Sequence, residues 1–221
     1  MKSPQQRKAE SIARLQAAAV PYIDWLPPIE DAAAVRVRSA EAIARRAIGC
    51  LIAIQAACDR NTGEYSPETA QWCMDLLKQY DISELTPNEV QILNHQGTEQ
   101  DVVNMVWKYE AYWTLLWALG IVDTLDFPDH AIDCQFAINA VSQHTDFAAF
   151  MQTVRLRDID TILDEADLIY RYHWACVDAR LKQQPMPANL NSSVVMERHA
   201  GLNWLIDADG SDDWDNPDIS T

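Results

Sequence analysis

The sequence predicts an all-α protein, a single globular multi-helix domain with a buried, tryptophan-rich central helix. The chain has 221 residues, of which 48% are hydrophobic, and a compact fold of this size buries roughly 70% of its unfolded surface. It contains only six glycines, which is few for the many tight turns of a β-protein. Apolar residues also recur at helical spacing between serine, threonine and proline start signals. We therefore expect helices throughout.

Residues 1–38 are predicted to form an N-terminal helix and a proline-containing arm that packs on the body. The helix covers residues 6–19. The prolines that follow it interrupt regular structure, because proline has no N–H donor and clashes in a helix interior. We expect Tyr22, Trp25 and Leu26 to pack this arm onto the rest of the protein.

A helical core is predicted over residues 39–206. Ser39 caps a long helix that reaches about Cys58, with its apolar residues on one stripe. Ser66-Pro67 and Thr86-Pro87 combine a capping residue with proline at the first helical position. They predict helices over residues 67–80 and 87–94.

The central helix is predicted from Thr98 to Leu119, and Gly120 ends it because glycine is favoured just past a helix end. Four further helices follow at 129–141, 146–154, from 158 to the prolines near 185, and 193–206. Residues 207–221 are predicted to be an acidic tail without regular structure. Trp214 in this tail indicates that it folds back onto the body.

The net charge of −16 argues against binding to nucleic acid or to an anionic membrane surface, because both carry negative charge. The start of the chain has no apolar run typical of a secretory signal, and no apolar stretch is long enough to cross a bilayer. The five cysteines lie singly, which favours reduced thiols over disulfides or a zinc site. We therefore predict a cytoplasmic protein that binds no nucleic acid and no membrane.

Glu110 is the polar residue that stands out in the central helix. On a helical wheel it lies in the middle of an aromatic face that includes Trp107, Trp113 and Trp117. The rest of the circumference is also largely apolar, so the helix should be buried. A carboxylate in that position must be paired, protonated or used, because an unpaired buried charge costs several kcal/mol.

Two later helices supply candidate partners for Glu110. Arg198 and His199 lie on the inward face of the last helix, and Arg171 and His173 flank the apolar stripe of the helix before it. We predict a buried polar cluster in which Glu110 pairs with Arg198 or Arg171. The full cluster is Glu110, Asp167, Arg171, His173, Arg198, His199 and Asn203.

Two interpretations of this cluster stay open. The first is a structural ion-pair network that fixes how three helices dock. The second is a ligand or catalytic pocket with these polar groups at its floor. The predicted wall of such a pocket is aromatic and consists of Trp107, Trp113, Tyr170 and Trp174.

The sequence predicts neither a metal site nor a cofactor. Glu197 and His199 are ligand types, but residues two apart point to different sides of a helix, and no pair has the spacing that places two ligands on one helical turn. The chain also lacks a phosphate-cradling glycine loop, a dinucleotide fingerprint and a nucleophile elbow. No motif names a reaction, so whether the protein is an enzyme is left open.

Five segments together resemble a bacterial family known as domain of unknown function 4272. The segments are RSAEAIARRA at 38–47, WKYEAYW at 107–113, DLIYRYHW at 167–174, ERHAGLNWL at 197–205 and DWD at 213–215. Their order and spacing match over roughly residues 35–221. The resemblance implies a helical fold and a bacterial origin, and it implies no activity, substrate or partner.

Two classes of function therefore compete. The first is a non-catalytic, cytosolic helical binding or interaction protein, whose partner is a protein with a basic surface attracted by the net charge of −16. The alternative is an enzyme or small-ligand binder that uses Glu110 as base or anchor. In that case Arg198 or Arg171 holds an anionic group and His173 or His199 carries a proton.

Overall fold

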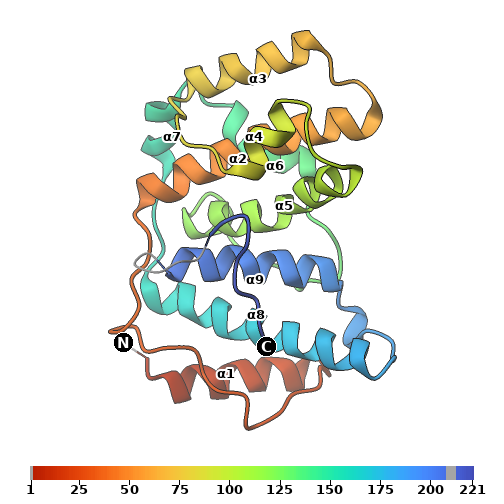
Figure 1. The fold of residues 1–221 in the computed structure, drawn as a ribbon. Coiled ribbons are helices and arrows are strands. Elements are labelled where there is room, and N and C mark those ends of the chain that lie inside the picture. Colours follow the sequence, from red (N-terminus) through yellow and green to blue (C-terminus); the bar gives the residue numbers. More distant parts are fainter. Residues whose placement is uncertain (1, 208–212) are drawn as a thin grey trace. The chain divides into compact units, whose positions relative to one another are not determined.

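The computed structural model of the chain describes residues 2–207 and 213–221 (Figure 1). The described residues are mostly helical, which confirms the all-α fold class. Their extended pairing is limited to one isolated parallel bridge between Arg36 and Asp207. None of the described helices is both long enough and apolar enough to cross a membrane.

The chain divides into two compact units, and each is described by itself. Unit 1 consists of Met1–Arg38, Thr124–Ala131 and Arg157–Thr221. Unit 2 consists of Ser39–Asp123 and Ile132–Leu156. Each unit therefore joins segments that are distant in the sequence. The predicted boundaries of arm, core and tail stay predictions.

Unit 1 is built on the long helix α8, which packs against α1 and α9 (Figure 1). The side chains of Ser3, Asp158 and Asn191 cap the three helices by accepting bonds from first-turn N–H groups. A short 3₁₀ turn, η1, precedes α9. The elements are α1 (Pro4–Ala17), α8 (Ile159–Leu181), η1 (Pro187–Asn189) and α9 (Ser192–Ile206).

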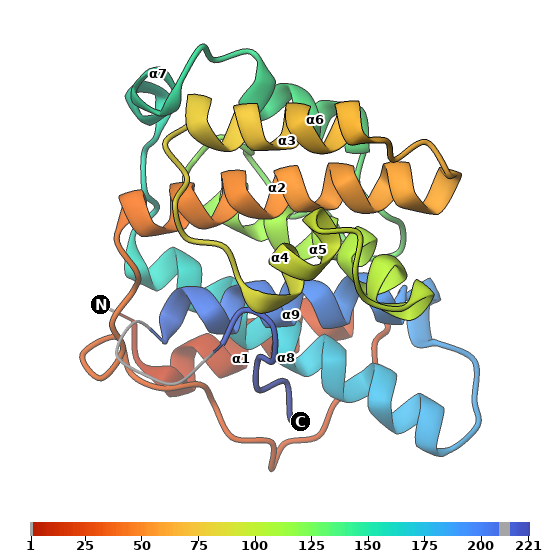
Figure 2. The same ribbon diagram turned by 45° about the horizontal axis from the view of Figure 1, so that its top comes forward.

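Unit 2 is built on α2, which packs against α3, α4 and α5 (Figure 2). Helix α5 also contacts α4 and α6. The predicted caps Ser39, Ser66, Thr86 and Thr98 all accept bonds from first-turn N–H groups. The elements are α2 (Ala40–Thr62), α3 (Pro67–Gln79), α4 (Pro87–Leu93), α5 (Glu99–Ala118), α6 (Cys134–Ser142) and α7 (Phe147–Thr153).

Gly120 follows the end of α5 with φ of +72°, a conformation that glycine adopts without steric cost. A Cβ atom there would lie 2.6 Å from the carbonyl oxygen of Arg155. The neighbouring Leu119 carbonyl accepts a hydrogen bond from the Arg155 N–H at 2.8 Å. Glycine is thus needed both for the turn and for the close approach of the chain after α7.

Three predictions about elements were wrong. Residues 129–133 are not helical, because Asp133 caps α6 and the helix begins at Cys134. Helix α2 continues past Cys58 to Thr62 and ends at Gly63, whose φ is +77°. Trp25 does not pack the arm, since 77% of it is exposed, whereas Leu26 is buried.

The central helix is only partly as predicted. Trp117 is buried, but Trp107 and Trp113 are half-buried, and Val103 at the start of the helix is exposed. The rest of the buried face consists of smaller or aliphatic side chains and two tyrosines. It includes Met105, Tyr109, Ala111, Tyr112, Leu115 and Leu116.

The acidic tail folds back as predicted. Trp214 is buried and packs edge-on against Trp204 of α9, with ring centroids 5.3 Å apart. Residues 213–221 form no regular structure. The tail prediction also covered residues 208–212, which lie outside the described residues.

Candidate functional site

Glu110 is buried on α5 of unit 2, with 1% of its surface exposed. Its Oε1 accepts a hydrogen bond from the backbone N–H of Ile132 at 2.8 Å. That bond ties the carboxylate to the segment just before α6. Arg171 and Arg198 belong to unit 1, and the pairing of Glu110 with either arginine stays a prediction.

Asp167 and Arg171 form a buried ion pair on α8. The guanidinium donates through Nε and Nη2 to both carboxylate oxygens of Asp167, each at 2.8 Å. The pair also binds the arm, because Arg171 Nη2 donates to the carbonyl of Pro27 at 3.1 Å and Asp167 Oδ1 accepts from the Ile29 N–H at 3.3 Å. Within unit 1 these bonds connect α8 to the arm.

The structure brings together three further predicted residues in one hydrogen-bonded row. His173 and His199 face each other through their Nδ1 atoms at 2.8 Å. The Asn203 side-chain nitrogen lies 3.1 Å from His199 Nε2 and donates to the backbone carbonyl of Asp218 at 2.6 Å. The row therefore runs from the C-terminal tail through α9 to α8.

The bonds of this row fix the proton on each ring. A carbonyl oxygen can only accept, so the Asn203 atom facing Asp218 is the NH₂ group, and it also donates to His199 Nε2. His199 then carries its proton on Nδ1 and donates it to His173 Nδ1. Consequently His173 carries its proton on Nε2.

Both rings are neutral at pH 7. Burial lowers the pKa of His173 to about 4, and Arg180 acts in the same direction. Burial lowers the pKa of His199 to about 3, with a further contribution from His173, although Asp218 opposes it. A neutral pair agrees with the row of hydrogen bonds, since a doubly protonated ring could not accept the bond it receives.

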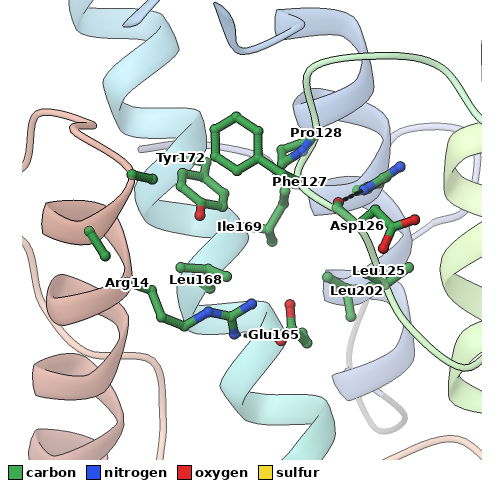
Figure 3. A pocket seen from close by; sticks show the side chains of 13 residues that line it. Arg14, Leu125, Asp126, Phe127, Pro128, Glu165, Leu168, Ile169, Tyr172 and Leu202 are labelled. Carbon is green, nitrogen blue, oxygen red and sulfur yellow. Dashed lines mark hydrogen bonds and ion pairs between the residues drawn. The ribbon is translucent and has the colours of Figure 1, made fainter. Parts of the chain in front are cut away.

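A cavity of about 380 Å³ lies between α8, α1, α9 and the segment 124–131 (Figure 3). Its walls are largely apolar. The rings of Phe127 and Tyr172 meet edge to face, with centroids 5.6 Å apart. The other apolar lining residues are Ala17, Ala18, Leu125, Pro128, Leu168, Ile169 and Leu202.

Few polar groups line this cavity, and both of its arginines make hydrogen bonds. Arg14 of α1 donates to Glu165 of α8 at 2.6 Å, as the dashed line in Figure 3 marks. Arg198 is buried and donates to the backbone carbonyl of Asp126 at 2.6 Å. Burial raises the pKa of the Tyr172 hydroxyl, so the hydroxyl stays neutral. The cavity thus combines an apolar body with charged groups.

Most residues of this cavity were not predicted from the sequence. Arg198 was predicted to point inward, and it does, whereas Arg14, Phe127 and Tyr172 were not singled out. The predicted pocket wall is placed differently: Tyr170 and Trp174 are half-buried on α8, and Tyr170 packs against His199 with ring centroids 5.8 Å apart. Trp107 and Trp113 belong to unit 2.

Among the described residues, no group of three or more histidine, cysteine, aspartate or glutamate side chains is placed to hold a metal ion. All five cysteines are free thiols; Cys50, Cys73 and Cys176 are buried, whereas Cys134 is exposed. The cavity and the histidine row consist of hydrogen-bonding, charged and apolar groups.

These features define a helical protein of two units with a mostly apolar cavity in one of them. A family model described as "Domain of unknown function (DUF4272)" matches residues 7–217, and the chain belongs to this family. Neither a curated protein nor a solved structure matches the chain.

Proposed function

We propose that this protein is a binding protein whose ligand is a small molecule with an apolar, ring-containing body and one anionic group. The proposal rests on the cavity of about 380 Å³ in unit 1, which lies within the size range of ligand sites in proteins. Its apolar walls suit a compact hydrophobic body. The function is non-catalytic, as in the first of the two competing classes, but its small-molecule ligand belongs to the second class, at a site other than Glu110.

Arg14 is the group best placed to bind the anionic end of the ligand. A guanidinium has five N–H donors, and Arg14 uses one of them for Glu165. Half of the Arg14 side chain is exposed, so its other N–H groups can bind a carboxylate or sulfonate of the ligand while the ion pair with Glu165 stays in place. Leu168 and Ile169 of α8 also line the cavity and would contact the apolar body of the ligand.

Binding can be tested with anilinonaphthalene sulfonate, a fluorescent probe that has this chemistry. Ala17 lines the cavity and is exposed at the end of α1, so Ala17→Trp should fill the cavity mouth without disturbing the core. We expect saturable binding that weakens about tenfold in Ala17→Trp. Ala13→Trp, one turn earlier on the same helix and also exposed, is the matched control and should bind as the unmodified protein does.

The contribution of Arg14 is read from a second comparison. Arg14→Gln should weaken binding of the sulfonate by about threefold to tenfold and leave binding of the neutral analogue phenylnaphthylamine unchanged. Equal losses in Ala17→Trp and Ala13→Trp, or an absence of saturable binding, would contradict the proposal. Circular dichroism and thermal unfolding of each variant check that the fold is retained.

We also propose that the protein acts in the cytoplasm of a bacterial cell. Support comes from the isolated, free cysteines and from the resemblance that the sequence motifs carry.

The net charge of −16 favours a basic protein surface as an additional partner. Native mass spectrometry of the complex with a basic candidate at two salt concentrations would test this, because such binding should weaken as salt rises.

A further inference from the structure

A second cavity, of about 220 Å³, lies in unit 1 where α8, the segment after it and the start of α9 meet. His173, Cys176 and Arg180 line it from α8, and Ser192 and Ser193 line it from α9. None of these residues lines the cavity of the proposed function. The two sites can therefore be tested separately.

The start of α9 presents hydrogen-bond donors to this cavity. Asn191 caps the helix by accepting from the N–H groups of Ser193 and Val194 at 3.1 and 3.4 Å. Its own N–H donates to the carbonyl of Pro128 at 2.8 Å, which fixes the position of the helix end. The N–H of Ser192 and both serine hydroxyls have no hydrogen-bond partner within the described residues.

His173 provides a second, independent indication of a ligand. The side chain is 8% exposed and lines the cavity. Its Nδ1 is occupied by His199, and the bonds of Asn203 place the remaining proton on Nε2. Among the described residues Nε2 has no partner. A nearly buried N–H donor is thus left for a ligand in the cavity.

The charge of the lining also favours an anion. Arg180 is exposed and forms no ion pair within the described part of the chain. Burial raises the pKa of the Cys176 thiol to about 11, so the thiol is neutral. No carboxylate is among the described residues that line this cavity. The lining therefore has one guanidinium and no carboxylate, although the net charge of the chain is −16.

From this arrangement we propose that the second cavity binds a phosphate group, held by the Arg180 guanidinium, the His173 Nε2–H, the Ser192 and Ser193 hydroxyls and the first N–H of α9. Donors from two helices suit an anion with several oxygens, and helix starts bind phosphate through their N–H groups and dipole. Arg180 adds a charge-assisted bond. The phosphate is either the free ion or the monoester of a small molecule.

Calorimetric titration with inorganic phosphate at constant ionic strength tests the proposal. We expect saturable binding, which weakens about tenfold in Arg180→Ala because a charge-assisted bond is lost. Lys182→Ala is the matched control. It removes the same charge two residues later, from a lysine that pairs with Asp178 at 2.8 Å and does not line the cavity, so affinity should stay within about twofold.

Ser192→Pro is a second variant that preserves the helix start. Proline is favoured at the first helical position, and Asn191 before it has ψ of 107°, which a following proline accepts. The change removes one N–H and one hydroxyl, so phosphate affinity should again fall about tenfold. Acetate should bind about tenfold more weakly than phosphate, because it offers fewer oxygens.

NMR gives a readout that does not depend on variants. The Ser192 and Ser193 amide signals should shift on titration with phosphate, and His173 should be protonated on Nε2.

Tighter binding of glycerol phosphate than of inorganic phosphate would support a monoester as ligand, and the reverse would support the free ion. Absence of saturable binding, equal losses in Arg180→Ala and Lys182→Ala, equal affinity for acetate, or a proton on His173 Nδ1 would each overturn the proposal.

Discussion

The arm after α1 and residues 213–221 of the tail are both irregular and both pack on helices of unit 1, but different chemistry holds them. The arm after α1 is held by a buried ion pair of α8. The tail after α9 is held by a tryptophan and by one side-chain amide. Each segment contains one prominent tryptophan, Trp25 in the arm and Trp214 in the tail, and only Trp214 is buried.

The difference lies in what each segment meets on the body of the unit. The arm passes over Asp167 and Arg171, which also hydrogen-bond to backbone groups of Ile29 and Pro27. The tail passes Trp204, whose ring is an apolar partner for Trp214, with the Arg38 guanidinium 4.3 Å from the same ring. An aromatic residue in an irregular segment is therefore an anchor only where the body supplies a ring or groove for it.

The largest effect is expected from removing the arm's ion pair. Arg171→Ala leaves the fully buried carboxylate of Asp167 without its charge partner, so we expect a loss of about 3–5 kcal/mol in the free energy of unfolding. Urea denaturation measures it. Arg14→Ala is the control, because Arg14 is half-exposed and its pair with Glu165 should contribute about 0–1 kcal/mol. Similar losses in the two variants would mean that burial of the pair does not matter.

The next effect is expected in the tail. Trp214→Ala removes the ring that packs on Trp204, and large aromatic truncations in buried positions cost about 3 kcal/mol. Loss of this contact should let the tail open more often, so limited proteolysis should cut residues near the C-terminus faster in this variant. A tail that stays protected would show that contacts other than the Trp214 ring, such as the Asn203 bond to Asp218, hold it.

A smaller effect is expected from pH, through the histidine row that leads to the tail. Both histidine pKa values are lower in the folded chain, about 4 and about 3, than the ordinary value of 6.5. Below about pH 6.5 the unfolded chain therefore takes up protons that the folded chain does not, and stability declines as the pH falls towards about 4. Between about pH 7.5 and about pH 5.8 the two histidines should together account for about 2 kcal/mol of this decline, about 1 kcal/mol each.

The measurement is urea denaturation at the two pH values. In the double variant His173→Gln, His199→Gln, the difference in the free energy of unfolding between the two pH values should shrink by about 2 kcal/mol. His130→Gln, which changes an exposed histidine of the same unit, is the control, and a decrease of the same size in that variant would contradict the assignment to the buried pair. An unchanged difference in the double variant would show that the rings are charged in the folded chain.

The smallest effect is expected for the tryptophan of the arm. Trp25→Ala should change the free energy of unfolding by about 0.5 kcal/mol or less, because 77% of the side chain is already exposed. Urea denaturation of Trp25→Ala and Trp214→Ala under the same conditions gives the direct comparison. A loss as large as that of Trp214→Ala would show that the arm packs through Trp25 after all.

Much of the fold could be predicted because its signals are local. Ser66-Pro67 and Thr86-Pro87 mark helix starts through their own side chains and backbone, and the structure places caps at both. The start of α6 was missed because two groups of the segment 129–133 bind elsewhere. Asp133 bonds forward to Gln135, and the Ile132 N–H donates to Glu110, which is 22 positions earlier in the chain.

The candidate sites could be predicted only where partners lie on one helix face. Asp167 and Arg171 are four residues apart on α8, so spacing alone indicates their pair. The contact between His173 and His199 joins positions 26 residues apart on two helices, and the wheel shows only that His199 lies on an inward face and His173 on the flank of an apolar stripe. The cavity beside Arg14 brings together α1, α8, α9 and the segment 124–131, and no local pattern encodes such an assembly.

The division of the chain into units also has a consequence for its synthesis. Unit 2 is complete once Leu156 has been made, but α1 must wait for α8, since Arg7 and its partner Asp164 are 157 positions apart. On the ribosome, α1 therefore emerges long before its packing partner, with the apolar side chain of Leu15 still uncovered. Nascent chains expose such surfaces to chaperones and proteases, and for this protein that period lasts until α8 is translated.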